Sequence, residues 1–177
     1  MKKLISGIMT VAIALSLAAC QKETKVISLS GKTMGTTYHV KYLDEGSMKA
    51  TSEKTHEEIE AILKDVNAKM STYKKDSELS RFNQNTQVNT PIEISADFAK
   101  VLAEAIRLNK VTEGALDVTV GPVVNLWGFG PEKRPEKKPT PEQLAERQAW
   151  VGIDKIALDM SGAKPVSYTH LTLPTIA

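Results

Sequence analysis

The sequence predicts a protein of mixed helix and strand that follows a short N-terminal export segment. Two stretches predict helices, because residues 53–70 and 96–112 carry apolar side chains at the spacing of an amphipathic helix. One stretch predicts a strand, because residues 38–42 alternate between apolar and polar side chains. Hydrophobic residues make up 41% of the 177 residues and charged residues 25%, which is typical of a folded globular protein.

Residues 1–19 differ in composition from the rest of the chain. Lys2 and Lys3 precede an apolar run that is short for a membrane span and that ends on small residues before Cys20. This arrangement resembles a bacterial lipobox, in which signal peptidase II cleaves before the cysteine and the cysteine is lipidated. The sequence therefore predicts a lipoprotein signal peptide over residues 1–19 with lipidation at Cys20. An ordinary secretory signal with an incidental cysteine is the alternative.

Lipidation at Cys20 has consequences for location and for charge. Cys20 is the only cysteine of the chain, so no thiol would remain for a disulfide. Several acyl chains hold a protein firmly at a membrane surface, and we expect this one to face the periplasm, with Gln21 favouring the outer membrane. Removal of Lys2 and Lys3 brings the formal net charge of +2 close to zero, which gives no support to nucleic-acid binding.

The first predicted elements are a tether, a strand and a helix. Residues 20–30 are polar and predict a flexible tether. The strand at residues 38–42 places its two tyrosines and Val40 on one face and leaves His39 facing solvent. The helix over residues 53–70 is expected to turn one apolar stripe toward a core. That stripe consists of Ile59, Ile62, Leu63, Val66 and Met70.

A polar loop with one aromatic residue follows this helix. Tyr73 in that loop either stacks on a flat ligand or covers the end of the helix, and the sequence leaves both open. Ser77 is placed to cap a short helix that carries Leu79 and Phe82.

A short extended piece at residues 92–94 leads into the second long helix. Ser95 is expected to cap the helix over residues 96–112, and Gly114 stands where a helix C-terminus favours a left-handed residue. The residues expected to face inward are Phe98, Val101, Leu102, Ala105 and Ile106.

The glycine-rich stretch over residues 113–131 comes directly after that helix. Its β-branched residues favour extended chain, its glycines permit sharp turns, and Asp117 places a carboxylate within it. Such a segment is either a tight packing corner or one wall of a binding site, and its spacing alone leaves both open.

The remaining elements and motifs complete the chain. Thr140, followed by proline and then by Gln143, predicts a capping box and a helix, and residues 151–159 predict a turn and a strand. The three histidines are scattered and show no metal-ligand spacing. No Gly-x-Ser-x-Gly motif is present, which disfavours a hydrolase triad.

Three stretches, at residues 33–38, 70–83 and 113–130, together resemble the ApbE family of FAD:protein FMN transferases. Their order and spacing match the family, and the resemblance covers roughly residues 20–160. It implies an α+β fold, T-fold-like, with helices packed on largely antiparallel sheet and FAD held between two subdomains. Residues 31–164 would form the N-terminal part of that domain.

The resemblance also implies an activity and its partners. Family members use Mg²⁺ to cleave FAD, attach FMN to a threonine of a partner flavoprotein, and release AMP. The acceptors are flavoprotein subunits of the sodium-pumping NADH:quinone reductase or of its Rnf relatives. Two alternatives are hydrolysis of FAD without an acceptor and a non-catalytic periplasmic lipoprotein that binds flavin or a protein.

Carried over residue by residue, the resemblance implies a flavin site. Met34 would line it and Tyr73 would contact the cofactor, while Ala115, Leu116 and Asp117 would hold FAD through backbone groups and the carboxylate. This favours the binding-site interpretation of the glycine-rich stretch over the packing corner.

The sequence departs from the family toward its C-terminus. Family members carry a second half with further motifs and the acidic Mg²⁺ site, and none of these motifs is present here. Residues 165–177 match nothing expected at that point, are interpreted as a non-native tail, and leave His170 without a role. We therefore expect half a flavin site, no complete metal site and no activity from this chain alone.

Overall fold

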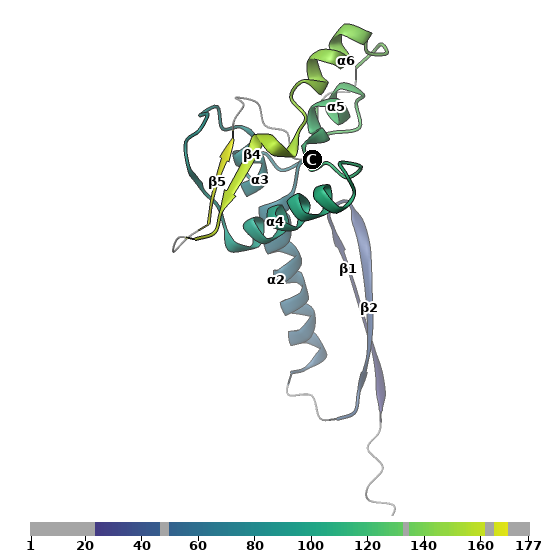
Figure 1. Cartoon of the computed structure of the whole chain (residues 1–177). Helices are drawn as coiled ribbons and strands as arrows, with labels where there is room; N and C mark the ends of the chain where they lie inside the picture. The colour runs from purple at the N-terminus through teal and green to yellow at the C-terminus, as the bar shows by residue number, and fades with distance from the viewer. Residues whose placement is uncertain (1–23, 47–49, 133–134, 162–164, 170–177) are drawn as a thin grey trace, which may run out of the picture. The chain divides into compact units, whose positions relative to one another are not determined.

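The computed structural model describes residues 24–46, 50–132, 135–161 and 165–169 (Figure 1). The predicted signal peptide, Cys20 and His170 lie outside these residues. The chain forms two compact parts, residues 1–62 and 63–177, and the boundary between them falls within helix α2 (Ser52–Met70). None of the helices in the described ranges combines the length and the hydrophobicity that a membrane span requires.

The first compact part contains a long antiparallel hairpin. Strands β1 (Lys25–Thr33) and β2 (Thr36–Asp44) pair along their whole length. Met34 and Gly35 form the connection, with φ angles of 50° and 75°. A two-residue turn with both φ angles positive matches the right-handed twist of paired strands, which explains the glycine at the second position.

The alternation predicted for the strand at residues 38–42 is confirmed, whereas the predicted tether differs from the structure. Val40 is half-buried and His39 is exposed, as the alternation requires. Strand β1 begins at Lys25, so much of the segment expected to be a tether is paired with β2. Pairing satisfies the backbone hydrogen bonds of this segment, and Leu29 buries its side chain on the inner face.

A polar cluster joins the hairpin to the first turns of α2. The Tyr38 hydroxyl donates a hydrogen bond to Glu60 Oε1 at 2.6 Å and lies 2.9 Å from His56 Nε2. A Cβ atom at position 31 would collide with both Tyr38 and Glu60, so Gly31 allows this close approach. The hydrogen bond to Glu60 raises the pKa of Tyr38 to about 12.

Helix α2 confirms the predicted helix but not the predicted burial of its whole stripe. Met70, at its C-terminal end, packs against the core, while Ile62 is 63% exposed and Val66 is also exposed. No residue of the helix is fully buried. The stripe is therefore correct as a helical pattern, with Ile59 and Leu63 half-buried and Ile62 and Val66 exposed.

The second compact part combines five further helical segments, the 3-10 turn η2 and a small sheet among its described residues (Figure 1). Strand β5 (Val166–Thr169) lies between β3 (Ile92–Glu93) and β4 (Ile156–Asp159) and pairs antiparallel with both. Helices α3 (Glu78–Asn83) and α4 (Ala96–Val111) supply most of the buried side chains. Strand β5 lies within residues 165–177, which the sequence analysis interpreted as a non-native tail.

The core of this part is built around an aromatic pair. Phe82 and Phe98 meet edge to face with ring centroids 5.3 Å apart, and Phe98 is only 2% exposed. The inward face predicted for α4 is confirmed at Phe98, Leu102 and Ala105. It is wrong at Val101, which is 53% exposed, because the buried face of α4 is narrower than the predicted stripe. The core cluster comprises Leu79, Phe82, Ile94, Phe98, Ala99 and Leu102.

The predicted helix starts are confirmed by their capping hydrogen bonds. Ser77 caps α3 and Ser95 caps α4, each through a side chain that accepts from the backbone three residues on. Thr140 and Gln143 form the full reciprocal capping box of α6 (Pro141–Gln148). The predicted turn and strand at residues 151–159 are also present, as the 3-10 turn η2 (Ile153–Lys155) followed by β4.

The β-branched residues of the glycine-rich stretch favoured extended chain, but the structure has helical turns at these residues. Residues 118–126 form the 3-10 turn η1 (Val118–Val120) and helix α5 (Gly121–Leu126). Asp117 caps η1 with its side chain, and Pro122 stands in the first turn of α5, where its missing N–H costs nothing. These local signals outweigh the strand propensity of valine and threonine, which depends on context.

Candidate functional site

The hairpin turn of the first compact part exposes Met34. A hollow of about 480 Å³ lies at this turn and is lined by residues 32–37. Met34 is exposed and has positive φ, so the turn presents a flexible, polarisable thioether to solvent. This is a surface on which an apolar ring can rest, and it belongs to a different compact part from the other predicted site residues.

Tyr73 lies on a loop whose backbone is fixed by hydrogen bonds with serine side chains. Ser71 Oγ accepts hydrogen bonds from the backbone N–H groups of Tyr73 and Lys74 at 3.2 and 3.1 Å. The buried hydroxyl of Ser77 donates to the Ser71 carbonyl at 2.5 Å. Tyr73 itself is 71% exposed, so its ring points to solvent instead of covering the helix end. A fixed backbone with an exposed aromatic ring is suited to stacking on a flat ligand.

A cavity beside α3 is also lined by residues of the second resemblance motif. It has a volume of about 470 Å³, and its lining includes Glu78, Phe82 and Ser95. Both oxygens of the Glu78 carboxylate accept hydrogen bonds from Ser95, from its N–H at 2.5 Å and its hydroxyl at 2.6 Å. Glu78 therefore serves to hold the start of α4 in place.

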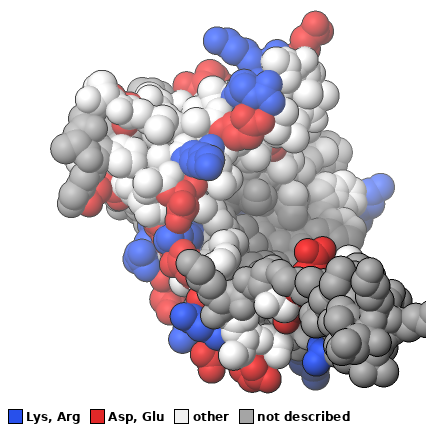
Figure 2. Space-filling view, turned by 90° about the horizontal axis from the view of Figure 1, so that it is seen from below, with Lys and Arg blue, Asp and Glu red and all other residues white. Residues whose placement is uncertain are grey.

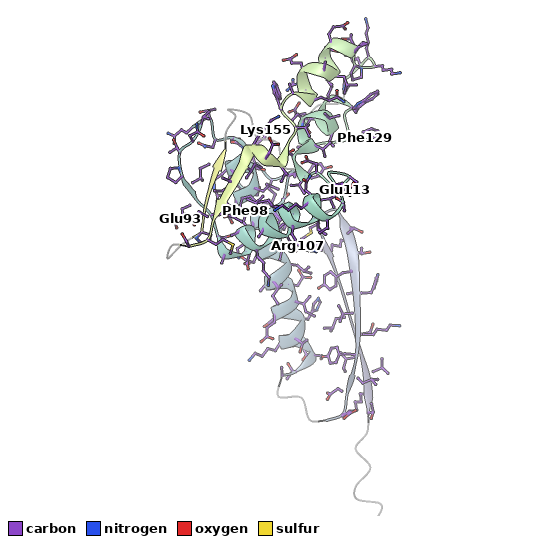
Figure 3. The ribbon with its side chains drawn as sticks, in the orientation of Figure 1. Glu93, Phe98, Arg107, Glu113, Phe129 and Lys155 are labelled. Carbon is purple, nitrogen blue, oxygen red and sulfur yellow. The ribbon has the colours of Figure 1, made fainter. Side chains whose placement is uncertain are left out.

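The C-terminus of α4 delivers the chain into the next loop through a Schellman motif. Gly114 N–H donates to the Asn109 carbonyl at 2.8 Å, and Glu113 N–H donates to the Lys110 carbonyl at 3.3 Å. The prediction of a left-handed Gly114 is confirmed by its φ of 84°, while Glu113, with φ of 53°, holds the position that usually carries glycine. Figure 3 shows Glu113 at this end of α4.

Ala115 and Leu116 are exposed, but their backbone donors are already engaged. Ala115 N–H donates to the Thr112 carbonyl at 3.0 Å, and Leu116 N–H donates to Thr112 Oγ1 at 3.1 Å. The Leu116 carbonyl accepts from Asn109 Nδ2 at 2.8 Å. These bonds fix the loop, so a ligand would meet the Ala115 carbonyl and the side chains here, not the two amide donors.

Asp117 is held by a residue that sequence reasoning missed. Its Oδ1 atom accepts from Thr119 N–H at 2.8 Å and from the Thr119 hydroxyl at 2.5 Å. Thr119 Oγ1 in turn accepts from Gly152 N–H at 2.7 Å, and Thr119 is 0% exposed. The Asp-x-Thr spacing is a known turn signal and could have indicated the first contact. Nothing in the sequence indicated the contact with Gly152, which is remote in the chain.

The end of the glycine-rich stretch exposes a second aromatic ring. Phe129 follows α5 and extends from the ribbon into solvent (Figure 3). The loop is tight, because a Cβ atom on Gly130 would collide with Asn125. Asn125 also donates to Glu132 Oε1 at 3.0 Å, which closes the loop from the other side.

Metal-ligating side chains do not gather in the parts of the chain that the structure describes. No group of three His, Cys, Asp or Glu residues there could hold a metal ion. In the view of Figure 2, basic and acidic side chains are interspersed over the described surface. The Mg²⁺ that the resemblance implies has no ligand set among these residues.

Of the predicted site residues, Ala115, Leu116 and Asp117 lie on one fixed loop, and Tyr73 lies on another in the same compact part. Among the described residues, no hydrogen bond or ring contact joins Tyr73 to that loop. Each loop is fixed by its own hydrogen bonds and offers a group that a flat ligand with N–H or O–H donors can use, the exposed ring of Tyr73 on one and the Asp117 carboxylate on the other.

Solved structures share this fold. The flavin transferase ApbE from Vibrio cholerae superimposes with a TM-score of 0.78 at 48% identity, covering 87% of this chain and 48% of that one. The apo form of the Pseudomonas stutzeri flavinyl transferase ApbE also gives a TM-score of 0.78, at 32% identity, covering 86% of this chain and 47% of that one. The protein therefore has the α+β fold of the flavin transferases.

Sequence comparison identifies the family. The model of the ApbE family matches residues 34–177, and the chain belongs to the ApbE family. A Haemophilus influenzae protein named FAD:protein FMN transferase is 93% identical over 179 residues, covering 97% of this chain and 52% of its own length. The chain spans about half the length of curated relatives from Haemophilus influenzae and Vibrio cholerae.

Proposed function

We propose that the protein is the N-terminal half of a transferase that moves FMN from FAD to a threonine hydroxyl of a partner flavoprotein and releases AMP. The threonine oxygen forms a new bond to the FMN phosphorus, the pyrophosphate bond to AMP breaks, and the hydroxyl proton passes to solvent. The names of the relatives support the substrate and the presence of a protein acceptor. Mg²⁺ would neutralise charge on the two phosphates, and its ligands would lie outside the described residues.

One observation carries the proposal for this chain, namely the fixed orientation of Asp117. Two hydrogen bonds from Thr119 occupy its Oδ1 atom, and no other described residue donates to its Oδ2 atom. A carboxylate oxygen held in this way accepts a hydrogen bond from a ring N–H or a ribose hydroxyl. Tyr73 would supply a stacking surface for the isoalloxazine ring.

The acceptor and the location follow from the same proposal. We expect the acceptor to be a flavoprotein subunit of a sodium-pumping NADH:quinone reductase or an Rnf-type complex. We also expect a lipid anchor on Cys20 to hold the enzyme at a membrane surface that faces the periplasm. Replacing Cys20 with serine should abolish incorporation of labelled palmitate into the protein. Labelling at the level of the unsubstituted protein would contradict the anchor.

The proposed function is tested in a version of the chain that has the full length of its relatives, called here the extended protein. In this protein Asp117 is replaced. We expect Asp117→Asn to slow FMN transfer to an acceptor by roughly tenfold to a hundredfold, the effect of losing a hydrogen bond to a charged group. Covalent flavin on the acceptor is measured by in-gel fluorescence. Unchanged transfer would contradict the assignment of Asp117.

The chain offers a matched control at Asp159. Its Oδ1 atom accepts from Ser161 N–H at 2.8 Å and from the Ser161 hydroxyl at 2.7 Å, the same local arrangement as at Asp117. Asp159→Asn therefore makes the same chemical change in the same kind of turn away from the glycine-rich stretch. Transfer should remain at the level of the unsubstituted protein.

A further inference from the structure

Thr119 stands between two segments that are far apart in sequence. Its hydroxyl donates to Asp117 Oδ1 at 2.5 Å and accepts from Gly152 N–H at 2.7 Å. The second contact spans 33 positions of the chain, between the glycine-rich stretch and the turn before η2. Thr119 is therefore the one residue in the described ranges whose side chain hydrogen-bonds to both Asp117 and this turn.

The Gly152 contact determines where the Thr119 hydroxyl proton points. A hydroxyl group has one proton to donate, and a backbone N–H that donates to the oxygen directs that proton elsewhere. At Thr119 the remaining acceptor is Asp117 Oδ1. Thr119 is 0% exposed, so water does not compete for either bond, and its β-branched side chain has restricted rotation.

Gly152 is suited to this task by its backbone conformation. Its φ angle is 145°, a value that residues with a side chain rarely adopt. In that conformation the Gly152 N–H group points at Thr119 Oγ1 and donates a hydrogen bond to it. A Cβ atom at this position would also collide with Asp154 Oδ1. Glycine at position 152 therefore adopts without strain the backbone conformation in which its N–H meets Thr119.

The turn at Asp159 has the same pair of hydrogen bonds to its carboxylate but lacks, among the described residues, an N–H donor equivalent to that of Gly152. Ser161 makes the same two bonds to Asp159, but it is exposed, and no described residue donates to its hydroxyl oxygen. The two turns thus differ in the burial of the hydroxyl group and in the Gly152 N–H that directs the hydroxyl of Thr119.

We propose that Thr119 is a positioning residue for FAD binding: braced by Gly152, it fixes the Asp117 carboxylate so that Oδ2 faces the ligand. This inference rests on the proposed function, because it assigns a role through Asp117. Binding of a ligand usually costs free energy because side chains lose conformational freedom. Because the Asp117 carboxylate is already fixed before FAD binds, this cost is avoided at Asp117. Thr119 itself touches no ligand in this arrangement.

Five versions of the extended protein test the proposal by FAD fluorescence titration: unsubstituted, Thr119→Val, Thr119→Ser, Asp117→Asn and the control Ser161→Ala. Thr119→Val keeps the shape and removes both bonds of the hydroxyl, and should weaken FAD binding roughly tenfold, which corresponds to 1.4 kcal/mol. Thr119→Ser keeps the hydroxyl and should bind FAD within about twofold of the unsubstituted protein. Ser161→Ala is the matched control and should bind FAD normally.

A double substitution separates positioning from a purely structural role. If Thr119 acts through the Asp117 carboxylate, Thr119→Val should add little further loss in an Asp117→Asn background. A full additional tenfold loss in that background would overturn the proposal. Hydrogen exchange at the Gly152 amide gives a readout that does not depend on FAD, and it should accelerate in Thr119→Val but not in Thr119→Ser or Asp117→Asn.

The outcomes distinguish this inference from the proposed function. Absence of FAD binding by the unsubstituted extended protein would overturn the proposed function and the role of Thr119 with it. Weakened binding in Asp117→Asn together with normal binding in Thr119→Val would overturn the role of Thr119 alone. If Thr119→Val does not fold, normal binding and slow Gly152 exchange in Thr119→Ser support the proposal, and weak binding in that folded variant overturns it.

Discussion

At the residue scale, the structure places single polar side chains where they fix a neighbour. Thr119 fixes Asp117, Ser77 fixes the loop of Tyr73, and Glu60 fixes Tyr38. Each of these side chains belongs to a chain segment that the sequence analysis identified. Local patterns contain the role of Ser77 as a helix cap and the contact of Thr119 with Asp117, two residues away. The contacts of Glu60 with Tyr38 and of Gly152 with Thr119 join remote segments, which local sequence patterns do not reveal.

The contact between Tyr38 and Glu60 predicts a pH dependence. Its hydrogen bond to Glu60 raises the pKa of Tyr38 from 10.0 to about 12. The protonated phenol therefore contributes stability that is fully present below pH 10 and is lost as the pH rises through about 12. In Glu60→Gln the pKa of Tyr38 should fall toward 10.0, because the partner loses its charge.

Ultraviolet titration of the tyrosinate band measures this shift, with Tyr38→Phe identifying the contribution of Tyr38. Glu57→Gln, on the same helix, is the control and should leave the titration of Tyr38 unchanged. A Tyr38 that titrates near pH 10 in the unsubstituted chain would contradict the hydrogen bond.

At the element scale, starts of helices were the most predictable features. The caps at Ser77, Ser95 and Thr140 use local hydrogen bonds, so short sequence patterns contain all of their information. The segment after Asp117 was harder to predict, because its valines favour strand while Asp117 and Pro122 start helical turns. The exposure of Val101 was also missed, because tertiary packing sets the width of a buried face.

Ser77 gives a test at this scale. Its buried hydroxyl both caps α3 and donates to the Ser71 carbonyl, so Ser77→Ala removes two hydrogen bonds at once. We expect a loss of about 1 to 2 kcal/mol in the free energy of unfolding, measured by urea denaturation. Ser28→Ala, at an exposed strand position, should change it by less than about 0.5 kcal/mol. Equal effects of the two substitutions would contradict the role of Ser77.

At the scale of the whole molecule, burial is uneven. Residues of α3 and α4 form a compact core around Phe98, whereas apolar residues in the middle of α2 face solvent. The family membership, the helix order and the strand at residues 38–42 could be predicted from the sequence, because motifs and periodicity contain them. The partner strand β1 was missed, because its residues were expected to form a tether. The distribution of burial could not, because it depends on which segments are available to pack against each stripe.

This distribution of burial predicts that replacing a buried apolar residue and replacing an exposed one have different effects on the stability of the 177-residue chain. Phe98→Ala removes a buried ring and its edge-to-face partner, and should lower the free energy of unfolding by about 3 to 5 kcal/mol. Ile62→Ala, at a mostly exposed position of α2, should lower it by less than about 1 kcal/mol. Thermal denaturation followed by circular dichroism measures both. A larger loss from Ile62→Ala than from Phe98→Ala would contradict the described packing.

The central claim is that the braced loops of Tyr73 and Asp117 bind the flavin nucleotide. Fluorescence titration of FAD with the extended protein tests it most directly, with Asp159→Asn as the control. The account predicts saturable binding that survives in Asp159→Asn and is lost when Tyr73→Ala and Asp117→Asn are combined. Binding of equal strength in the combined variant would contradict it.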